Sequence, residues 1–256
     1  VTNPKQSRPA TPSRGFVDLT ALMAIRNLEL RARTIVQGFW TGIHRSPKHG
    51  FSVEFTEYRP YAPGDDIRFL DWRAYARSDR FYIKRFEEET NRGSLLLTDN
   101  SRSMSYTSLA WTKANYANTL AGTLAYFLHL QGDPIGLLTF DERVREYHPV
   151  RSRPGHLRRL MLLLEKPAGG SYTDLERPLR RVAELLRKRS LVVLISDLLA
   201  PVSRLETLLT RLAASGHEVV AFQVLDPAEV SFGFRESAIF EDLESRREMF
   251  LDPQAV

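Results

Sequence analysis

The sequence contains no cysteine among its 256 residues. This absence excludes a disulfide framework, a thiolate zinc site, an iron–sulfur cluster and a cysteine nucleophile. No apolar run approaches the length of about 18 residues that a membrane-spanning helix needs, and no charged-then-apolar leader opens the sequence. We therefore expect a soluble, cytoplasmic protein with no membrane span.

The sequence motifs of several enzyme classes are also missing. There is no G-x-x-x-x-G-K-[ST] phosphate loop, no G-x-G-x-x-G dinucleotide fingerprint and no G-x-S-x-G nucleophile elbow. The six histidines have no metal-type spacing. The serines considered below have no general base nearby in the sequence apart from one aspartate, so acyl transfer is poorly supported. We expect a protein that is not an enzyme.

The net charge of +5 is concentrated in the first third of the chain. Residues 1–93 hold 16 basic and 11 acidic residues, whereas residues 94–256 hold 20 of each. The excess fits a binding surface for nucleic acid or for an acidic partner, or else a solvated basic tail with structural ion pairs. We favour the tail, because no aromatic RNA-binding string, zinc finger or helix-turn-helix pattern accompanies the charge.

Composition shifts divide the chain into three parts. Residues 1–14 are rich in Pro, Ser and Arg and are predicted to form a flexible basic tail. Residues 15–93 begin with a helical pattern from Phe16 to about Trp40 and continue as a β-rich appendage. Within the appendage, strand-like runs lie near 51–58 and 81–86. Residues 94–256 form the third part.

The third part alternates between strand and helix patterns. Apolar runs typical of strands buried on both faces lie at 94–98, 134–140 and 191–196. Further strands are expected at 144–148, 217–225, 238–243 and 248–251. One-sided apolar stretches predict helices from Ala110 to Leu128, at 156–164, at 175–189, and from a Ser203–Glu206 capping box to Gly216. The alternation predicts an α/β fold with a mostly parallel, doubly wound sheet flanked by helices.

Polar side chains follow the predicted strands at the places where such a sheet binds ligands. Asp99, Ser101 and Ser103 come after one buried strand, Asp197 follows another, and Thr173 lies in a glycine-containing loop before a predicted helix. Ligands bind beyond the carboxyl ends of parallel strands, where the strand order reverses. Oxygen ligands alone suit Mg²⁺ or Mn²⁺. Each residue taken alone could instead be a helix cap or a turn residue. A metal site is favoured because all of them occur in this order along the chain, each at an expected strand end or loop.

This constellation resembles the metal-ion-dependent adhesion site of von Willebrand factor A-like domains. The upstream segment at 54–90 is similar to a motif of the domain-of-unknown-function fifty-eight (DUF58) family. The matching positions are Arg59, Tyr61, Pro63, Gly64, Asp65, Asp66, Arg68, Asp71, Trp72, Ala76 and Arg77. The resemblance implies a von Willebrand A-like fold and a role beside MoxR-type AAA+ ATPases in assembling or activating other proteins. It implies no family-wide enzymatic activity.

The segment with the Pro63–Asp66 motif has two physical interpretations of its own. Its aspartates alternate with arginines, so it can form an ion-pair lattice that holds the appendage to the sheet domain. It can also be an interaction surface, because core packing does not require so many arginines. A second metal site at Asp65 and Asp66 is the least favoured possibility.

The sequence thus predicts a divalent-metal-dependent protein-interaction module. Asp99, Ser101, Ser103, Thr173 and Asp197 would hold Mg²⁺ or Mn²⁺, and an acidic residue of a partner would complete the metal's ligands. The suggested partner is a MoxR-type AAA+ ATPase or its client. The alternatives are a metal-dependent hydrolase that uses the same residues and a nucleic-acid-binding protein that uses the basic first third.

Overall fold

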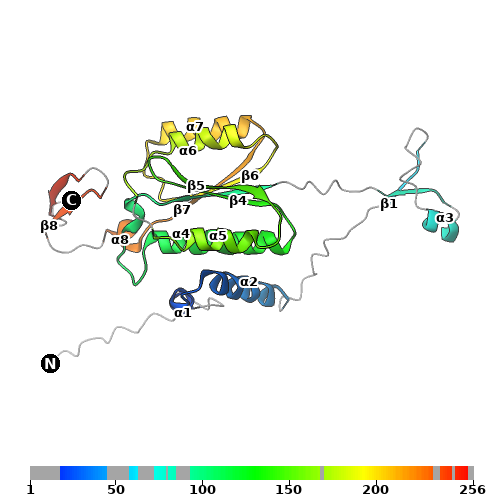
Figure 1. Cartoon of the computed structure of the whole chain (residues 1–256), viewed down its shortest axis with the longest axis horizontal. Helices are drawn as coiled ribbons and strands as arrows, with labels where there is room; N and C mark the ends of the chain where they lie inside the picture. Colours follow the sequence, from blue (N-terminus) through cyan, green and yellow to red (C-terminus); the bar gives the residue numbers. More distant parts are fainter. Residues whose placement is uncertain are drawn as a thin grey trace, which may run out of the picture. The chain divides into compact units, whose positions relative to one another are not determined.

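A five-stranded sheet forms the centre of the fold in the computed structural model (Figure 1). Its strands are β3 (Ser94–Asp99), β4 (Ile135–Phe140), β5 (Val144–Arg151), β6 (Leu191–Ser196) and β7 (Glu218–Gln223). They lie in the order β5-β4-β3-β6-β7, with β5 antiparallel to β4 and the other neighbours parallel. The predicted α/β fold with a mostly parallel sheet is confirmed.

The structure describes most of the chain from residue 18 onward. The described residues are 18–44, 58–62, 72–78, 80–84, 93–167, 170–232, 237–243 and 246–252. The chain divides into two compact units, residues 44–91 and residues 1–43 with 92–256. The predicted tail at 1–14 lies outside the described residues. No helix of the described residues is long and apolar enough to cross a membrane.

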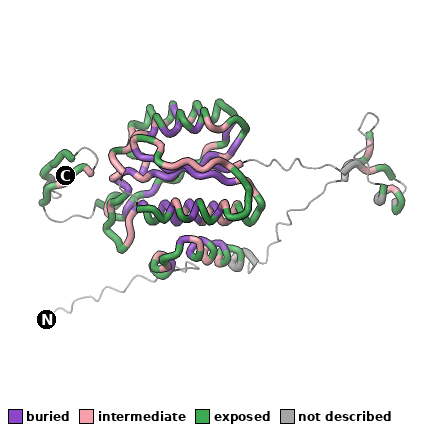
Figure 2. The backbone as a smooth tube through the Cα atoms, in the orientation of Figure 1, coloured by how far each residue is buried: buried purple, intermediate pink, exposed green. Residues whose placement is uncertain are grey.

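Helices cover both faces of the sheet because its central strands are apolar on both sides. Every residue of β3 and β4 is buried, as the uninterrupted apolar runs predicted (Figure 2). Helices α4 (Lys113–Leu130) and α5 (His156–Leu164) cover one face, where Leu96 of β3 joins the core. Helices α6 (Glu176–Leu185) and α7 (Val202–Ala214) cover the other face, where Leu95 and Leu97 point. Successive residues of one strand thus supply two separate cores.

Helix α7 begins differently from the prediction. Val202 is its first residue, Pro201 precedes it, and no side chain caps its amino end. The predicted Ser203–Glu206 capping box is therefore wrong, because Ser203 already lies inside the helix. Pro201 supplies the start instead, since its fixed φ suits a helix entry and it lacks a backbone N–H. The predicted stop is confirmed: the helix ends at Ala214 and Gly216 follows with φ of 86°.

Two N-terminal helices lie in the same unit as the sheet. Helix α1 (Leu19–Ala24) is capped by Asp18, and α2 (Leu28–His44) begins after Asn27, whose side chain accepts a hydrogen bond from the Leu30 N–H at 2.7 Å. The prediction of one continuous helical stretch is wrong, because α1 ends at Ala24 and Asn27 caps the start of a second helix. Leu28 and Ala32 of α2 belong to the core that α4 and α5 form on the sheet.

The unit of residues 44–91 contains two short strands and a helix. Strands β1 (Tyr58–Pro60) and β2 (Tyr82–Lys84) pair antiparallel, close to two predicted strand-like runs. Helix α3 (Trp72–Ser78) was not predicted. The rings of Tyr75 and Phe81 stack with centroids 4.3 Å apart, so α3 contacts the residue that directly precedes β2. Residues 63–71 lie outside the described residues, and with them the predicted ion-pair lattice and the Asp65–Asp66 site.

The chain ends in a short helix and a separate hairpin. Helix α8 (Pro227–Ser231) is capped by Asp226 and Glu229, which form a capping box. Strands β8 (Ala238–Glu241) and β9 (Glu248–Leu251) pair antiparallel with each other and form a sheet of their own.

Candidate metal site

The sheet topology brings the ends of β3 and β6 together. The chain passes from β3 to β4 on one side and returns later to β6 on the other side, so the strand order reverses between β3 and β6. Asp99 is the last residue of β3, and Asp197 directly follows β6. The Ser196 hydroxyl donates a hydrogen bond to Asp99 Oδ2 at 2.6 Å, which locks the two strand ends together. The switch point that the sequence predicted is therefore lined by Asp99, Ser196 and Asp197.

Ser101 and Ser103 turn back over the end of β3. The Ser101 N–H donates to Asp99 Oδ1 at 2.8 Å, and the hydroxyl oxygens of Ser101 and Ser103 lie 3.2 Å apart. Ser103 begins a short 3₁₀ turn, η2 (Ser103–Ser105). Asp99, Ser101, Ser103 and Asp197 are all buried. The structure thus brings together Asp99, Ser101 and Ser103, as their alternation predicted.

The loop that carries Thr173 is bonded to the loop after β3. The Gly170 N–H donates to the Asn100 carbonyl at 3.0 Å, and the Arg102 N–H donates to the Ser171 carbonyl at 2.9 Å. A Cβ atom on Gly170 would lie 2.6 Å from the Asn100 carbonyl oxygen, so only glycine allows this approach. Thr173 is half-buried and lies three residues after Gly170. The three predicted segments therefore converge.

Buried Asp141 supports the same loop from the end of β4. Its Oδ2 accepts hydrogen bonds from Arg145 and from the Ser171 N–H, and its backbone carbonyl accepts one from the Asp174 N–H. Burial by itself would raise the pKa of Asp141, but the hydrogen bonds and the Arg145 charge outweigh it and hold the pKa below its usual value. An ionised carboxylate is thus fixed beside the candidate site in a structural role.

The surroundings of Asp99 disfavour the ionised form of its carboxyl group. Burial raises its pKa to about 6, the hydrogen bonds from Ser101 and Ser196 oppose the rise, and the charge of Asp197 adds to it. A cation placed against this carboxylate would favour its ionised form and lower that pKa.

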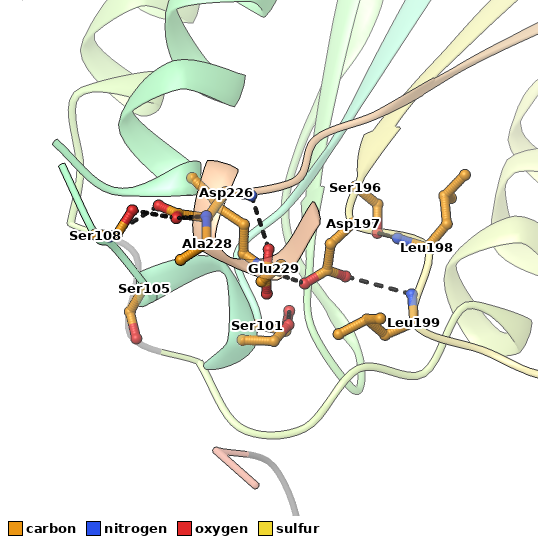
Figure 3. Close-up of polar contacts among 12 residues, drawn as sticks. Ser101, Ser105, Ser108, Ser196, Asp197, Leu198, Leu199, Asp226, Ala228 and Glu229 are labelled. Carbon is orange, nitrogen blue, oxygen red and sulfur yellow. Dashed lines mark hydrogen bonds and ion pairs between the residues drawn. The ribbon is translucent and has the colours of Figure 1, made fainter. Parts of the chain in front are cut away.

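One residue of the site was missed by the sequence reasoning. Lys113, the first residue of α4, is buried, and its ammonium lies 2.9 Å from Asp197 Oδ2 and 2.7 Å from Glu229 Oε1. A lysine in the first turn of a helix opposes the helix dipole. This unfavourable position is the sequence feature from which a special role of Lys113 could have been predicted. Asp197 Oδ1 also accepts the Leu199 N–H at 3.4 Å (Figure 3).

The residues present fit a divalent cation by charge and by ligand type. The carboxylates of Asp99, Asp197 and Glu229 and the ammonium of Lys113 sum to −2 when all are ionised, which a dication would balance. The buried oxygens Asn100 Oδ1 and Ser171 Oγ have no hydrogen-bond partner. No group of three or more His, Cys, Asp or Glu side chains that could hold a metal ion occurs among the described residues. The donor set is oxygen alone, the chemistry that Mg²⁺ and Mn²⁺ prefer.

The candidate site borders a hollow. Its volume is about 760 Å³, and Ser103 forms part of its wall. The remaining lining is apolar and acidic, with Tyr106, Leu199, Gln223, Leu225, Glu229, Phe232, Phe240, Glu241, Asp242 and Leu243. Of the five candidate ligands, Ser103 is the one in the wall of this hollow, so another molecule can approach Ser103 from this side.

Known proteins similar to this chain match it along most of its length. The model of the family described as "Protein of unknown function DUF58" matches residues 57–255. Uncharacterized proteins of Mycobacterium bovis and Mycobacterium tuberculosis are 29% identical over 257 residues, which cover 98% of this chain and 80% of each relative.

Solved structures are similar at lower identity. An aerotolerance-related membrane protein from Bacteroides fragilis gives a TM-score of 0.48 at 15% identity, covering 64% of this chain and 83% of that one. The conserved hypothetical protein BatB from Bacteroides thetaiotaomicron gives 0.45 at 15% identity, covering 62% and 75%.

Proposed function

We propose that this chain, which belongs to the DUF58 family of proteins of unknown function, is a von Willebrand A-like interaction module that binds a partner through a divalent metal. The observation that carries the proposal is the convergence of Asp99, Ser101 and Ser103 with Asp197 at the switch point of a mostly parallel sheet. Two carboxylates and neighbouring hydroxyls at this point form a ligand set for Mg²⁺ or Mn²⁺.

Each residue has a distinct role in the proposal. Ser101, Ser103 and Thr173 would hold the cation through their hydroxyls, and Asp99 and Asp197 would act directly or through water. The carboxylate of Asp197 also accepts hydrogen bonds from Lys113 and from the Leu199 N–H. Lys113 and Glu229 would fix the orientation of Asp197. Neutral hydroxyl ligands leave the cation electrophilic, so it would attract a carboxylate supplied from outside.

The partner would contribute an Asp or Glu side chain through the hollow beside Ser103. Family resemblance suggests a MoxR-type AAA+ ATPase or a client of such an ATPase. Under this proposal the chain assembles or activates other proteins and catalyses no reaction itself.

A metal-dependent hydrolase built on the same ligands would need a general base. Among the described residues, each carboxylate at the switch point is engaged: Asp99 accepts from Ser101 and Ser196, and Asp197 pairs with Lys113. This engagement favours the binding module over the hydrolase. Nucleic-acid binding through the basic first third of the chain stays an alternative, and half of the 16 Lys and Arg residues of that part lie outside the described residues.

The proposal is tested by metal-dependent capture. The full chain would be immobilised and exposed to a purified MoxR-type ATPase and to lysate from the same source, with Mg²⁺ or with chelator. We expect proteins that bind only with Mg²⁺ and that are lost from a Ser101→Ala/Ser103→Ala variant, while Ser105→Ala retains them. Binding that persists in chelator, or that the double variant leaves intact, would contradict the proposal.

A further inference from the structure

A polar hollow lies where helix α2 meets α4 and α5. Its volume is about 310 Å³, at the lower end of the range for small-molecule sites. Helix α2 packs on the core that α4 and α5 form, and the loop between α1 and α2 adds to the wall (Figure 1). Three basic, one acidic and four neutral polar residues line the hollow, and the five candidate metal ligands lie outside this lining. The hollow is therefore a separate candidate site.

Arg31 is a buried cation in the wall of this hollow. Its guanidinium donates to the Thr119 hydroxyl at 2.7 Å and to the carbonyls of Met23 and Ile25. Every acceptor that the guanidinium has among the described residues is neutral. Burial lowers the pKa of Arg31, and the charge of Glu165 opposes this effect. Because a buried charge is unfavourable without an opposite charge beside it, this wall of the hollow favours an anion.

The other charged groups around the hollow leave the balance positive. Arg26 and Lys166 line it together with Arg31, and Glu165 is the carboxylate in its wall. The Lys166 ammonium pairs with Glu146 at 2.6 Å, and Glu165 accepts a hydrogen bond at 2.9 Å from the first backbone N–H of α2. With Glu146 included, these five side chains still sum to +1. A small anion in the hollow would balance this charge.

Asn118 adds a polar group whose hydrogen bonding is incomplete. Its side chain lines the hollow, the residue is 8% exposed, and its Oδ1 has no hydrogen-bond partner among the described residues. A buried polar atom without a partner is destabilising, so it calls for a bound molecule that can donate a hydrogen bond. Ser105, Thr112 and Asn115 supply further hydroxyl and amide groups to the wall.

The size and the lining of the hollow restrict what the anion is. At about 30 Å³ for each water, the hollow has room for about ten water molecules, so an inorganic phosphate ion would leave most of it empty. Within the described part of the chain, no aromatic side chain lines the hollow, so a nucleobase has no ring to stack on. Hydroxyl groups suit the wall best, because they donate and accept hydrogen bonds.

We propose that this hollow binds a sugar phosphate. Its phosphate would lie toward Arg26 and Lys166 and balance the charge of Arg31, and one of its hydroxyls would donate to Asn118 Oδ1. The ligand would thus join the loop between α1 and α2 to helix α4. The proposal does not depend on a bound metal ion, and either proposal can fail without the other.

The first test is calorimetric titration of the full chain, in chelator, with glucose 6-phosphate and ribose 5-phosphate. We expect saturable one-to-one binding of at least one of them. Inorganic phosphate should bind at least about tenfold more weakly, and glucose should not bind, because each lacks one half of the recognised groups. Absence of binding by both sugar phosphates, or equally tight binding of inorganic phosphate, would overturn the proposal.

The second test locates the binding in this hollow. Arg26→Glu reverses an exposed charge of the lining and should weaken binding of the sugar phosphate at least about tenfold. Arg33→Glu makes the same change of charge at an exposed position of α2 outside the lining, and should leave the affinity within about twofold. Equal effects of the two variants would overturn the assignment to this hollow.

The third test separates recognition of the sugar from that of the phosphate. Asn118→Leu keeps a side chain of similar size without the amide, and it should weaken binding of the sugar phosphate but not of inorganic phosphate. Thermal unfolding of the variant without ligand checks that it is folded. Hydrogen exchange of the wild-type chain should slow in α1 and α2 when the ligand binds. A folded Asn118→Leu chain with unchanged affinity, and unchanged exchange in α1 and α2, would overturn the proposed contacts.

Discussion

At the scale of single residues, the ammonium group of Lys113 offsets negative charge at the candidate site. Lys113 is buried between Asp197 and Glu229 and bonds to both. A buried ion pair adds little stability compared with an apolar pair, yet removal of one partner leaves the other charge unpaired and costs much more. Lys113 therefore matters chiefly because Asp197 would be uncompensated without it.

Lys113→Met should lower the free energy of unfolding by about 3–5 kcal/mol in chelator, because it leaves the buried Asp197 without a counter-charge. Mg²⁺ should recover part of this loss by supplying positive charge. Urea unfolding with and without Mg²⁺ measures both effects. Lys166→Met is the matched control: its ammonium pairs with Glu146 on the surface, and its loss should cost about 0–1 kcal/mol. Equal costs for the two variants would contradict the assignment.

Asp99 gives the site a pH dependence whose sign follows from its pKa. The pKa is about 6 in the folded chain and 3.8 ordinarily, so the folded chain binds more protons between these values. Stability of the metal-free chain should therefore fall as pH rises from about 4 to 6, through this group. Asp99→Asn should lose that dependence, and the stability difference between variant and wild type, measured in chelator, should change across this window. A flat difference would show that Asp99 ionises normally.

Among the elements, the apolar strands were the most predictable part. The strands at 94–99 and 191–196 could be found from sequence because burial on both faces demands uninterrupted apolar runs. The convergence of Asp99, Ser101 and Ser103 followed from the same logic. A signal for Lys113 lay in its place in the first turn of a helix, but its partners could not be found, because Asp197 and Glu229 come from distant parts of the chain. Helix α3 was hidden among aromatic and charged residues that resemble a strand pattern.

The attachment of α2 to the sheet domain combines core packing by Leu28 and Ala32 with one buried arginine, whose partners could not be predicted from the sequence. The Arg31 guanidinium donates to the Thr119 hydroxyl of α4 at 2.7 Å and to the backbone carbonyls of Met23 and Ile25. This group ties together α1, α2 and α4.

Arg31→Ala should destabilise the chain by about 1.5–3 kcal/mol, the range for hydrogen bonds to a charged group. It should also increase hydrogen exchange in α1 and α2 more than in β3. Arg33→Ala, at an exposed position of the same helix, should change neither quantity appreciably. Uniform destabilisation of all elements by Arg31→Ala would show that α2 unfolds together with the sheet.

At the scale of the whole molecule, the candidate site lies at the ends of the central strands of a sheet whose edge strands are β5 and β7. The site lies where β3 and β6 end, and the exposed edge of β7 lies on the next strand.

The most direct test of metal binding is to measure the Tm of the full chain during titration with Mg²⁺ or Mn²⁺. At about 100 times its dissociation constant, a single bound ion should add about 2.7 kcal/mol of stability. For a chain of this size that corresponds to a Tm increase of about 5–10 °C. Ser103→Ala should reduce the increase strongly, and Ser101→Ala/Ser103→Ala should abolish it. Ser105→Ala, in the same 3₁₀ turn but exposed, should preserve it. A Tm that does not move with either ion, or that moves equally in all variants, would contradict the account.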